Sequence, residues 1–261
     1  MMQKPILLDI ADEVATITLN RPANGNAINL ELADALQQAM KTCEKERGVR
    51  AIVLRGAGKL FCSGGDLSAI ASHGADASSY VRELLTRLHG AISAMARIPT
   101  PVVAGVNGAA AGAGLALACG CDLAIATESS LFVMAYSRVG LTPDGSSSFY
   151  LPRLIGLRRA LQMALTNRQL TAREALDWGI VNEVVQDAAL DSALTALVGR
   201  LVKGSPVALG GAKRLLRAPS ANTLDQQLLA EMESICAALK TDDAKEGLSA
   251  FLEKRVPNFG N

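Results

Sequence analysis

Aromatic residues are scarce in this chain of 261 residues, and neither sign of charge predominates. There are one Trp, three Tyr and five Phe, and 26 Lys and Arg stand against 25 Asp and Glu, for a net charge of +1. RNA-binding sites need a basic surface or stacking aromatic rings, and anionic membranes attract basic proteins. The composition therefore argues against nucleic acid and membrane partners, and small and aliphatic side chains must fill the core.

Histidine and paired cysteine motifs are also lacking. Only His73 and His89 are present, and the five cysteines include no C-x-x-C pair. Zinc sites need His and Cys ligands at characteristic spacing, so no metal site is expected. An odd number of unpaired cysteines is typical of reduced thiols, which favours a cytoplasmic location. Asp9 comes too early for the apolar segment of a secretory signal peptide, so none is expected.

A long uncharged run occurs at residues 99–121. It contains Asn107, five glycines and many alanines, whose transfer into lipid gains little free energy. A strand, a loop and a buried helix explain the run better than a membrane span. Cys119 and Cys121 lie on the predicted helix, where core packing is their expected role.

Hydrophobic periodicity predicts a chain in which strands and helices alternate. Strands are predicted at 14–20, 49–58, 101–106 and 180–185, helices at 30–46, 78–98, 158–166 and 172–179, and a helix followed by a strand within 114–127. This alternation indicates an α/β fold with parallel strand pairing. From about residue 187 onward only helical patterns remain. The basic stretch 203–217 is interpreted as a solvated helix face.

Two glycine-rich segments follow predicted strands: "IVLRGAGKLFCSGGDLSAI" (52–70) and "PVVAGVNGAAAGAGLALA" (101–118). Neither is a P-loop, since Leu60 stands where the hydroxyl residue should be, and neither has the G-x-G-x-x-G or G-x-S-x-G spacing. Two backbone N–H groups from such turns can form an oxyanion hole. Close packing of a helix on a strand is the alternative use of the small residues.

Five segments in order resemble the crotonase family, also called the enoyl-CoA hydratase/isomerase family. They are "RPANGNAIN" (21–29), "FCSGGDL" (61–67), "VNGAAAGAGLALACGCDLAIA" (106–126), "LTNRQLTAREALDWGIVNEVV" (165–185) and "FLEKRVPNF" (251–259). The resemblance implies an α/β spiral of repeated β-β-α units over 1–190. It also implies a helical C-terminal trimerisation region over 191–261, and a homotrimer or dimer of trimers.

The same resemblance implies an acyl-CoA substrate and assigns site residues. Coenzyme A would enter as part of the substrate thioester, with no permanently bound cofactor and no metal. The backbone N–H groups of Gly65 and Ala113 match the donors of the family's oxyanion hole. Residues beside the substrate and its CoA would be Ala27, Ser63, Gly64, Asp66, Leu67 and Tyr136. Lys254 matches a basic residue that reaches the CoA phosphates near a subunit boundary, with a solvated lysine as the alternative.

One acidic residue, Asp144, stands in "VGLTPDGSSSFYLP" (139–152). The local residues allow a helix N-cap or a catalytic base. In the hydratases that this chain resembles, two glutamates match Ala116 and Tyr136. A single acid at Asp144 instead resembles the Δ3,Δ2-enoyl-CoA isomerases and the ring-epoxide isomerases of phenylacetate breakdown. One carboxylate can take a proton from C2 and return it to C4, so isomerisation of an enoyl-CoA is the predicted reaction.

Three alternatives stay open at this point. Hydration of a 2-enoyl-CoA would need acids that Ala116 and Tyr136 do not supply. The resemblance also extends to aryl-CoA dehalogenases, whose matching Asp is a nucleophile and whose pocket histidine matches His89. Those enzymes carry Trp at the position of Tyr136 and need an aromatic cage, which so few aromatics make doubtful. RNA-binding members of the fold need a basic surface that this chain lacks.

Overall fold

A six-stranded sheet forms the centre of the protein, whose computed structural model describes residues 4–218 and 222–259. Its strand order is β1-β2-β3-β4-β6-β9. The strands are β1 (Ile6–Ala11), β2 (Val14–Leu19), β3 (Ala51–Gly56), β4 (Val102–Val106), β6 (Leu123–Thr127) and β9 (Glu183–Val185). β1 pairs antiparallel with β2, and the other pairs are parallel. The predicted α/β class is confirmed.

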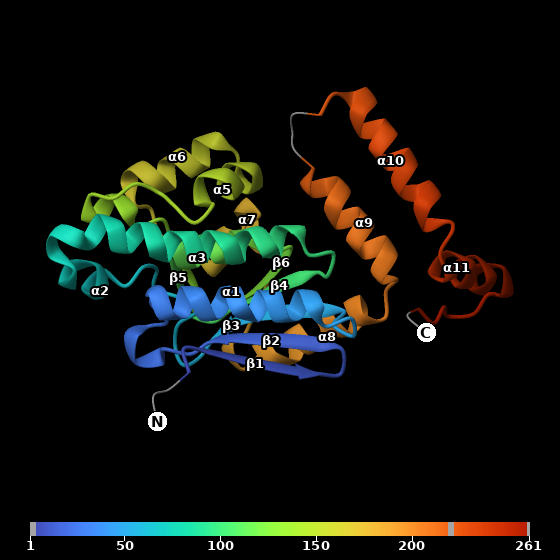
Figure 1. The fold of residues 1–261 in the computed structure, drawn as a ribbon, viewed down its shortest axis with the longest axis horizontal. Coiled ribbons are helices and arrows are strands. Elements are labelled where there is room, and N and C mark those ends of the chain that lie inside the picture. The colour runs from blue at the N-terminus through green and yellow to red at the C-terminus, as the bar shows by residue number, and fades with distance from the viewer. Residues whose placement is uncertain (1–3, 219–221, 260–261) are drawn as a thin grey trace.

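Helices cover both faces of this sheet (Figure 1). Helices α1 (Leu30–Lys45) and α3 (Ala77–Arg97) pack together on one face, where Ile52 and Leu54 of β3 join the main core. Helix α8 (Leu190–Val202) covers the other face, against the alternate residues Ala51 and Val53. Burial on both faces explains why β3 reads as a continuous apolar run rather than an alternating one.

A smaller sheet lies beside the first and carries the candidate site. It consists of β5 (Ala109–Ala111), β7 (Leu131–Val133) and β8 (Leu170–Thr171) in that order. The helices around it are α2 (Leu67–Ser72), α4 (Ala113–Gly120), α5 (Ser147–Ile155), α6 (Leu157–Thr166) and α7 (Ala172–Trp178). Every residue of α4 is buried. The uncharged run is thus β4, β5 and α4: the predicted strand and buried helix are confirmed, and the short strand β5 lies where a loop was expected. Cys119 in α4 and Cys121 directly after it are buried in the core.

Short 3-10 helices complete this part of the chain: η1 (Pro22–Asn24), η2 (Gly74–Asp76), η3 (Tyr136–Val139) and η4 (Asp187–Ala189). Within the described ranges, no helix combines the length and the apolar character needed to cross a membrane.

Three helices at the C-terminal end extend away from the sheets (Figure 1). They are α9 (Pro206–Arg217), α10 (Leu224–Ala238) and α11 (Asp242–Glu253). The interpretation of 203–217 as a solvated face is wrong at two positions. Lys213 and Arg217 both pair with Asp122 at 2.7 Å, and the Lys213 side chain is buried. This basic stretch therefore anchors α9 to the core. The predicted division at 190/191 stays a prediction.

Candidate active site

Backbone hydrogen bonds hold the segment 61–67 on both of its edges. On one edge the N–H of Ile28 donates to the oxygen of Gly64 at 2.8 Å. On the other edge the N–H of Cys62 donates to the oxygen of Ala109, in β5, at 3.1 Å. The loop that carries the predicted donor Gly65 is therefore part of a fixed layer between the 21–29 turn and the small sheet.

Gly64 brings this layer against the start of α4. Its φ of +103° is one that residues with a side chain rarely adopt. A Cβ built on Gly64 would lie 3.0 Å from the oxygen of Ala111 and 3.7 Å from the nitrogen of Ala113. The two predicted oxyanion segments thus touch at this glycine.

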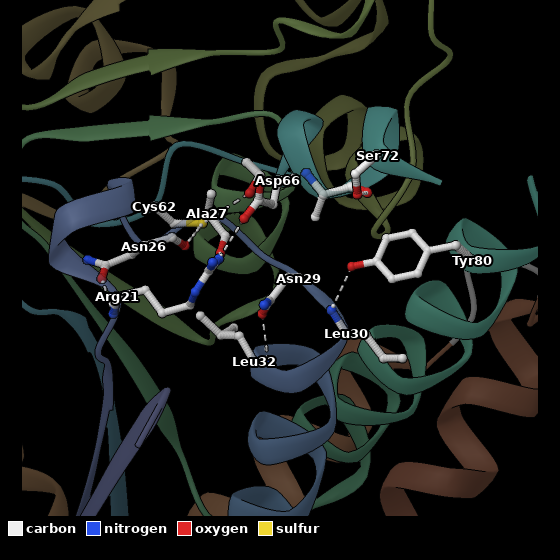
Figure 2. A network of polar contacts seen from close by, with 12 residues as sticks. Arg21, Asn26, Ala27, Asn29, Leu30, Leu32, Cys62, Asp66, Ser72 and Tyr80 are labelled. Atoms are coloured by element: carbon white, nitrogen blue, oxygen red, sulfur yellow. Dashed lines mark hydrogen bonds and ion pairs between the residues drawn. The ribbon is translucent and has the colours of Figure 1, made fainter. Parts of the chain in front are cut away.

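Arg21 braces the same layer from the side of the 21–29 turn (Figure 2). Its Nη1 donates to the oxygen of Ala27 and pairs with Oδ2 of Asp66 at 2.9 Å. The other carboxylate oxygen of Asp66 accepts from the N–H of Ala69 at 3.0 Å and caps α2. Burial raises the pKa of Asp66, but the bonds from Ala69 and Arg21 outweigh it, and the pKa is lowered. The Asp66 carboxylate is therefore engaged within the fold.

Asn26 is a second brace, and like Arg21 it was not predicted. It is fully buried at a φ of +56°, and its Nδ2 donates to the oxygens of Ala57 and Leu60 at 2.9 and 2.7 Å. The backbone oxygen of Asn26 accepts from the thiol of Cys62. Burial raises the pKa of that thiol to about 12, which excludes Cys62 as a thiolate nucleophile at neutral pH. In the sequence, the only sign of this role is the position of Asn26 in the turn segment 21–29.

Helix α4 begins at Ala113, directly against segment 61–67. A Cβ on Gly114 would lie 2.3 Å from the oxygen of Cys62, so this close approach requires glycine. Ala113 is the first residue of the helix, where N–H groups have no partner within the helix. Over the described ranges, neither the N–H of Ala113 nor that of Gly65 donates to another group of the chain. Two free donors on touching segments fit an oxyanion hole.

The turn that carries Asp144 packs against helix α4. A Cβ built on Gly145 would lie 3.2 Å from the Cβ of Ala116 and 4.0 Å from the Cα of Ala113. Gly145, the residue after Asp144, therefore packs against Ala113, whose N–H is a predicted oxyanion donor. Ala116, at the position matched by a hydratase glutamate, is fully buried and offers no proton-exchanging group.

The Asp144 carboxylate is hydrogen-bonded to Tyr136. The Tyr136 hydroxyl donates to Oδ1 at 2.5 Å. Burial and then the charge of Asp144 raise the pKa of Tyr136 well above its usual range, so the hydroxyl keeps its proton. Oδ2 accepts no hydrogen bond from the described part of the chain. One oxygen of Asp144 is therefore held by Tyr136, and the other has no hydrogen-bond partner among the described residues.

The N-cap alternative for Asp144 is wrong. Helix α5 starts at Ser147, its N-cap residue is Ser146, and no side chain caps it. Ser147 instead donates two hydrogen bonds to the backbone oxygen of Asp144, one from its N–H at 3.0 Å and one from its hydroxyl at 2.7 Å. The carboxylate is not used to start the helix.

His89 is exposed on α3. It comes three residues before Ile92, whose Cδ1 would lie 3.9 Å from a Cβ on Gly145. Its role in a pocket stays a prediction.

The other predicted residues fall into two groups. Ser63 and Leu67 are exposed at the surface of the 61–67 layer, and Ala27 is buried beneath it. Lys254 is the exposed residue directly after α11, and α11 lies at the opposite end of the molecule from α2 (Figure 1). The structure therefore brings Gly64, Gly65, Ala113, Tyr136 and Asp144 together and leaves Lys254 apart from them within one chain.

This arrangement combines two free backbone donors with one carboxylate. It can stabilise negative charge on a carbonyl oxygen and move a proton on a carbon next to that carbonyl. Among the residues that the structure describes, no group of three or more His, Cys, Asp or Glu side chains could hold a metal ion.

Comparison with known proteins identifies the family. The model of the enoyl-CoA hydratase/isomerase family matches residues 9–261. The chain is 38% identical to the 1,2-epoxyphenylacetyl-CoA isomerase of Escherichia coli, over 99% of each chain. It is 35% identical to 4-chlorobenzoyl coenzyme A dehalogenase-2 of an Arthrobacter species, over 96% of this chain and 91% of the relative.

A solved structure with the same fold is that of an enoyl-CoA hydratase from Polaromonas sp. JS666. It is 34% identical, superposes with a TM-score of 0.94, and the match covers 98% of this chain and 99% of that one. The predicted crotonase-like fold is confirmed, while the three relatives carry three different activities. The protein belongs to the enoyl-CoA hydratase/isomerase family.

Proposed function

We propose that this protein isomerises a C=C bond of an enoyl-CoA, from 3-enoyl to 2-enoyl or in a related ring acyl-CoA, with Asp144 as its single base. The observation that carries the proposal is the Asp144 carboxylate, whose Oδ2 has no hydrogen-bond partner among the described residues, in a turn whose Gly145 packs against Ala113 and Ala116. The thioester carbonyl would accept hydrogen bonds from the N–H groups of Gly65 and Ala113.

Isomerisation then needs one proton to move twice. Asp144 takes a proton from C2, and the electron pair of that bond delocalises into a dienolate whose oxygen lies in the oxyanion hole. The same carboxyl returns the proton to C4. A positioned general base contributes roughly 10²–10⁴-fold in rate, and each oxyanion donor about 10²–10³-fold.

Hydration of a 2-enoyl-CoA is the second candidate, because relatives are described as hydratases. It is less well supported by the site. Adding water needs a group that deprotonates it, and Ala116 has none. Tyr136 keeps its proton and is already bonded to Asp144. Dehalogenation of an aryl-CoA, with Asp144 as nucleophile, is less well supported again because aromatic residues are so few.

The remaining site assignments belong to the same proposal. Ala27, Ser63, Gly64, Leu67 and the backbone of Asp66 would follow the CoA chain. Lys254 would reach CoA phosphates across a subunit boundary in a homotrimer or dimer of trimers, since it is remote within one chain. Coenzyme A would be present only as part of the substrate, with no permanent cofactor, in a cytoplasmic protein without nucleic acid or membrane partners.

Turnover of three CoA esters by the purified protein tests the proposal. A 3-enoyl-CoA should isomerise faster than a 2-enoyl-CoA hydrates, by more than about tenfold, and a halobenzoyl-CoA should release no halide. Absorbance of the conjugated thioester follows the first two reactions, and a halide electrode follows the third. Hydration that outpaces isomerisation by the same factor, or halide release, would overturn the assignment.

A further inference from the structure

The backbone of Tyr136 is held at the start of the loop that leads to Asp144. The backbone N–H of Tyr136 donates to the backbone oxygen of Met134 at 2.8 Å, and the backbone oxygen of Tyr136 accepts from the N–H of Leu141 at 3.1 Å. The ring lies beside the start of α4, since a Cβ on Gly112 would be 3.8 Å from the Tyr136 Cζ. The hydroxyl is therefore fixed relative to the predicted oxyanion hole.

The contact with Asp144 is short and selective. The hydroxyl lies 2.5 Å from Oδ1 and 3.4 Å from the backbone oxygen of the same residue, and Oδ2 receives nothing from the chain as far as it is described. We infer that Tyr136 is a positioning residue for the base: its hydroxyl fixes Oδ1 and presents Oδ2 to C2 and C4 of the substrate. This inference rests on the proposed isomerase function.

The hydrogen bond from Tyr136 also affects how readily Asp144 releases the proton that it takes from C2. In the first step the C2–H bond breaks, an O–H bond forms at Oδ2, and the electron pair enters the dienolate. In the second step that O–H bond breaks and the proton bonds to C4. A donor to Oδ1 stabilises the ionised carboxylate more than the neutral acid, so it favours release of the proton to C4. The raised pKa of Tyr136 keeps its own proton in place throughout.

Other charged groups around Asp144 do not take this role. Helix α4 carries no charged side chain, and His89 on α3 is exposed. Arg138 of η3 donates to a carbonyl after α6, and Arg153 of α5 lies over an aromatic ring of its own helix. Over the described residues, Tyr136 supplies the side-chain hydrogen bond to the carboxylate.

The variant Tyr136→Phe removes only the hydroxyl and tests the inference. We expect kcat for isomerisation to fall about tenfold or more, with KM changed less than about threefold. The control is Tyr150→Phe, whose hydroxyl contacts Arg217 of α9 instead; it should leave kcat and KM unchanged.

A measurement without substrate separates this inference from the proposed function. The ¹³C carboxyl signal of Asp144, assigned with Asp144→Asn, is recorded at neutral pH in the wild-type protein, Tyr136→Phe and Tyr150→Phe. A chemical shift that changes only in Tyr136→Phe supports the inference, even where no ester is isomerised and the proposed function fails. An active wild-type enzyme whose Tyr136→Phe variant keeps its kcat and its Asp144 carboxyl signal would overturn the inference and leave the isomerase intact.

Discussion

Gly65 and Ala113 contribute to the candidate site through their backbone rather than their side chains. The carbonyl of a thioester can approach a backbone N–H only where side chains are small, which explains why the segments read as glycine- and alanine-rich. The resemblance to the family, carried by these segments, therefore assigns the two donors. It does not predict that a Cβ built on Gly64 would lie 3.7 Å from the nitrogen of Ala113, because that contact joins two loops far apart in the chain.

Replacing Ala113 by Pro tests the donor assignment at the level of one N–H group. Ala113 is the first residue of α4, the helix position where Pro is best tolerated because no hydrogen bond within the helix is lost. We expect Ala113→Pro to fold and to lose about 10²-fold or more in kcat, whereas Ala113→Gly keeps the N–H and most of the rate. Circular dichroism and initial rates of both variants decide. Full activity in a folded Ala113→Pro protein would refute the assignment.

The sequence and its family resemblance single out Asp144 as a candidate base, but they do not predict its hydrogen-bond partner. Tyr136 was expected to lie near the substrate, and nothing in its spacing from Asp144 predicts a hydrogen bond across an irregular loop. The same holds for Arg21, whose contacts with Ala27 and Asp66 depend on the path of the 61–67 layer. Side-chain pairs between loops have no periodicity, and therefore they leave no pattern in a single sequence.

Among the elements, most of those with a full period of hydrophobic residues were predicted, and most of the short strands were not. Helices α1 and α3 and strands β3 and β4 lie where the pattern places them. Strands β5, β7 and β8 span only two or three residues, too few for an alternation to be read. β1 was also missed, and its antiparallel pairing with β2 adds a hairpin to a sheet expected to be parallel.

Helix α9 is joined to the core by a cluster of charges around Asp122, which follows α4. The Lys213 side chain is 7% exposed, and besides Asp122 it contacts the backbone oxygens of Met95 and Thr100 at 2.9 and 3.1 Å. Arg217 contacts Asp122 and the Tyr150 hydroxyl. Removing one partner from a buried ion pair leaves a charge without compensation.

The variant Asp122→Asn should therefore destabilise the protein by about 3 kcal/mol and loosen α9 in particular. Denaturant unfolding measures the free energy, and hydrogen exchange over 206–217 locates the change. The control is Asp242→Asn, which removes an exposed pair with Lys245 and should leave the midpoint of unfolding where it was. Equal stability of Asp122→Asn and wild type would show that α9 is held by other contacts.

At the scale of the whole molecule, α10 presents an apolar stripe to solvent. Leu228, Met232, Ile235 and Leu239 recur at helical spacing and are each more than half exposed. Between α9, α10 and α11 lies an apolar groove of about 320 Å³ that Ile235 and Leu239 help to line. Apolar patches of this kind mark interaction surfaces, and the proposed trimer would cover this one.

Placing a charge in this stripe tests the proposed assembly. Wild-type protein should sediment at three or six times the mass of one chain. Ile235→Glu would bury an unpaired carboxylate in the interface, which costs several kcal/mol, and should shift the population toward monomers. Glu233→Gln, on the same helix, is the control and should leave the assembly intact. A wild-type monomer would contradict the proposed trimer.

The rate of isomerisation of a 3-enoyl-CoA by Asp144→Asn tests the central claim most directly. Asn keeps the shape of the side chain and an oxygen that can accept the Tyr136 hydroxyl, so the fold should survive and only basicity is lost. We expect kcat to fall by roughly 10²–10⁴-fold, while the melting temperature and the affinity for a CoA ester stay close to those of the wild-type protein. A stable variant that turns over at the wild-type rate would contradict the assignment of Asp144 as the base.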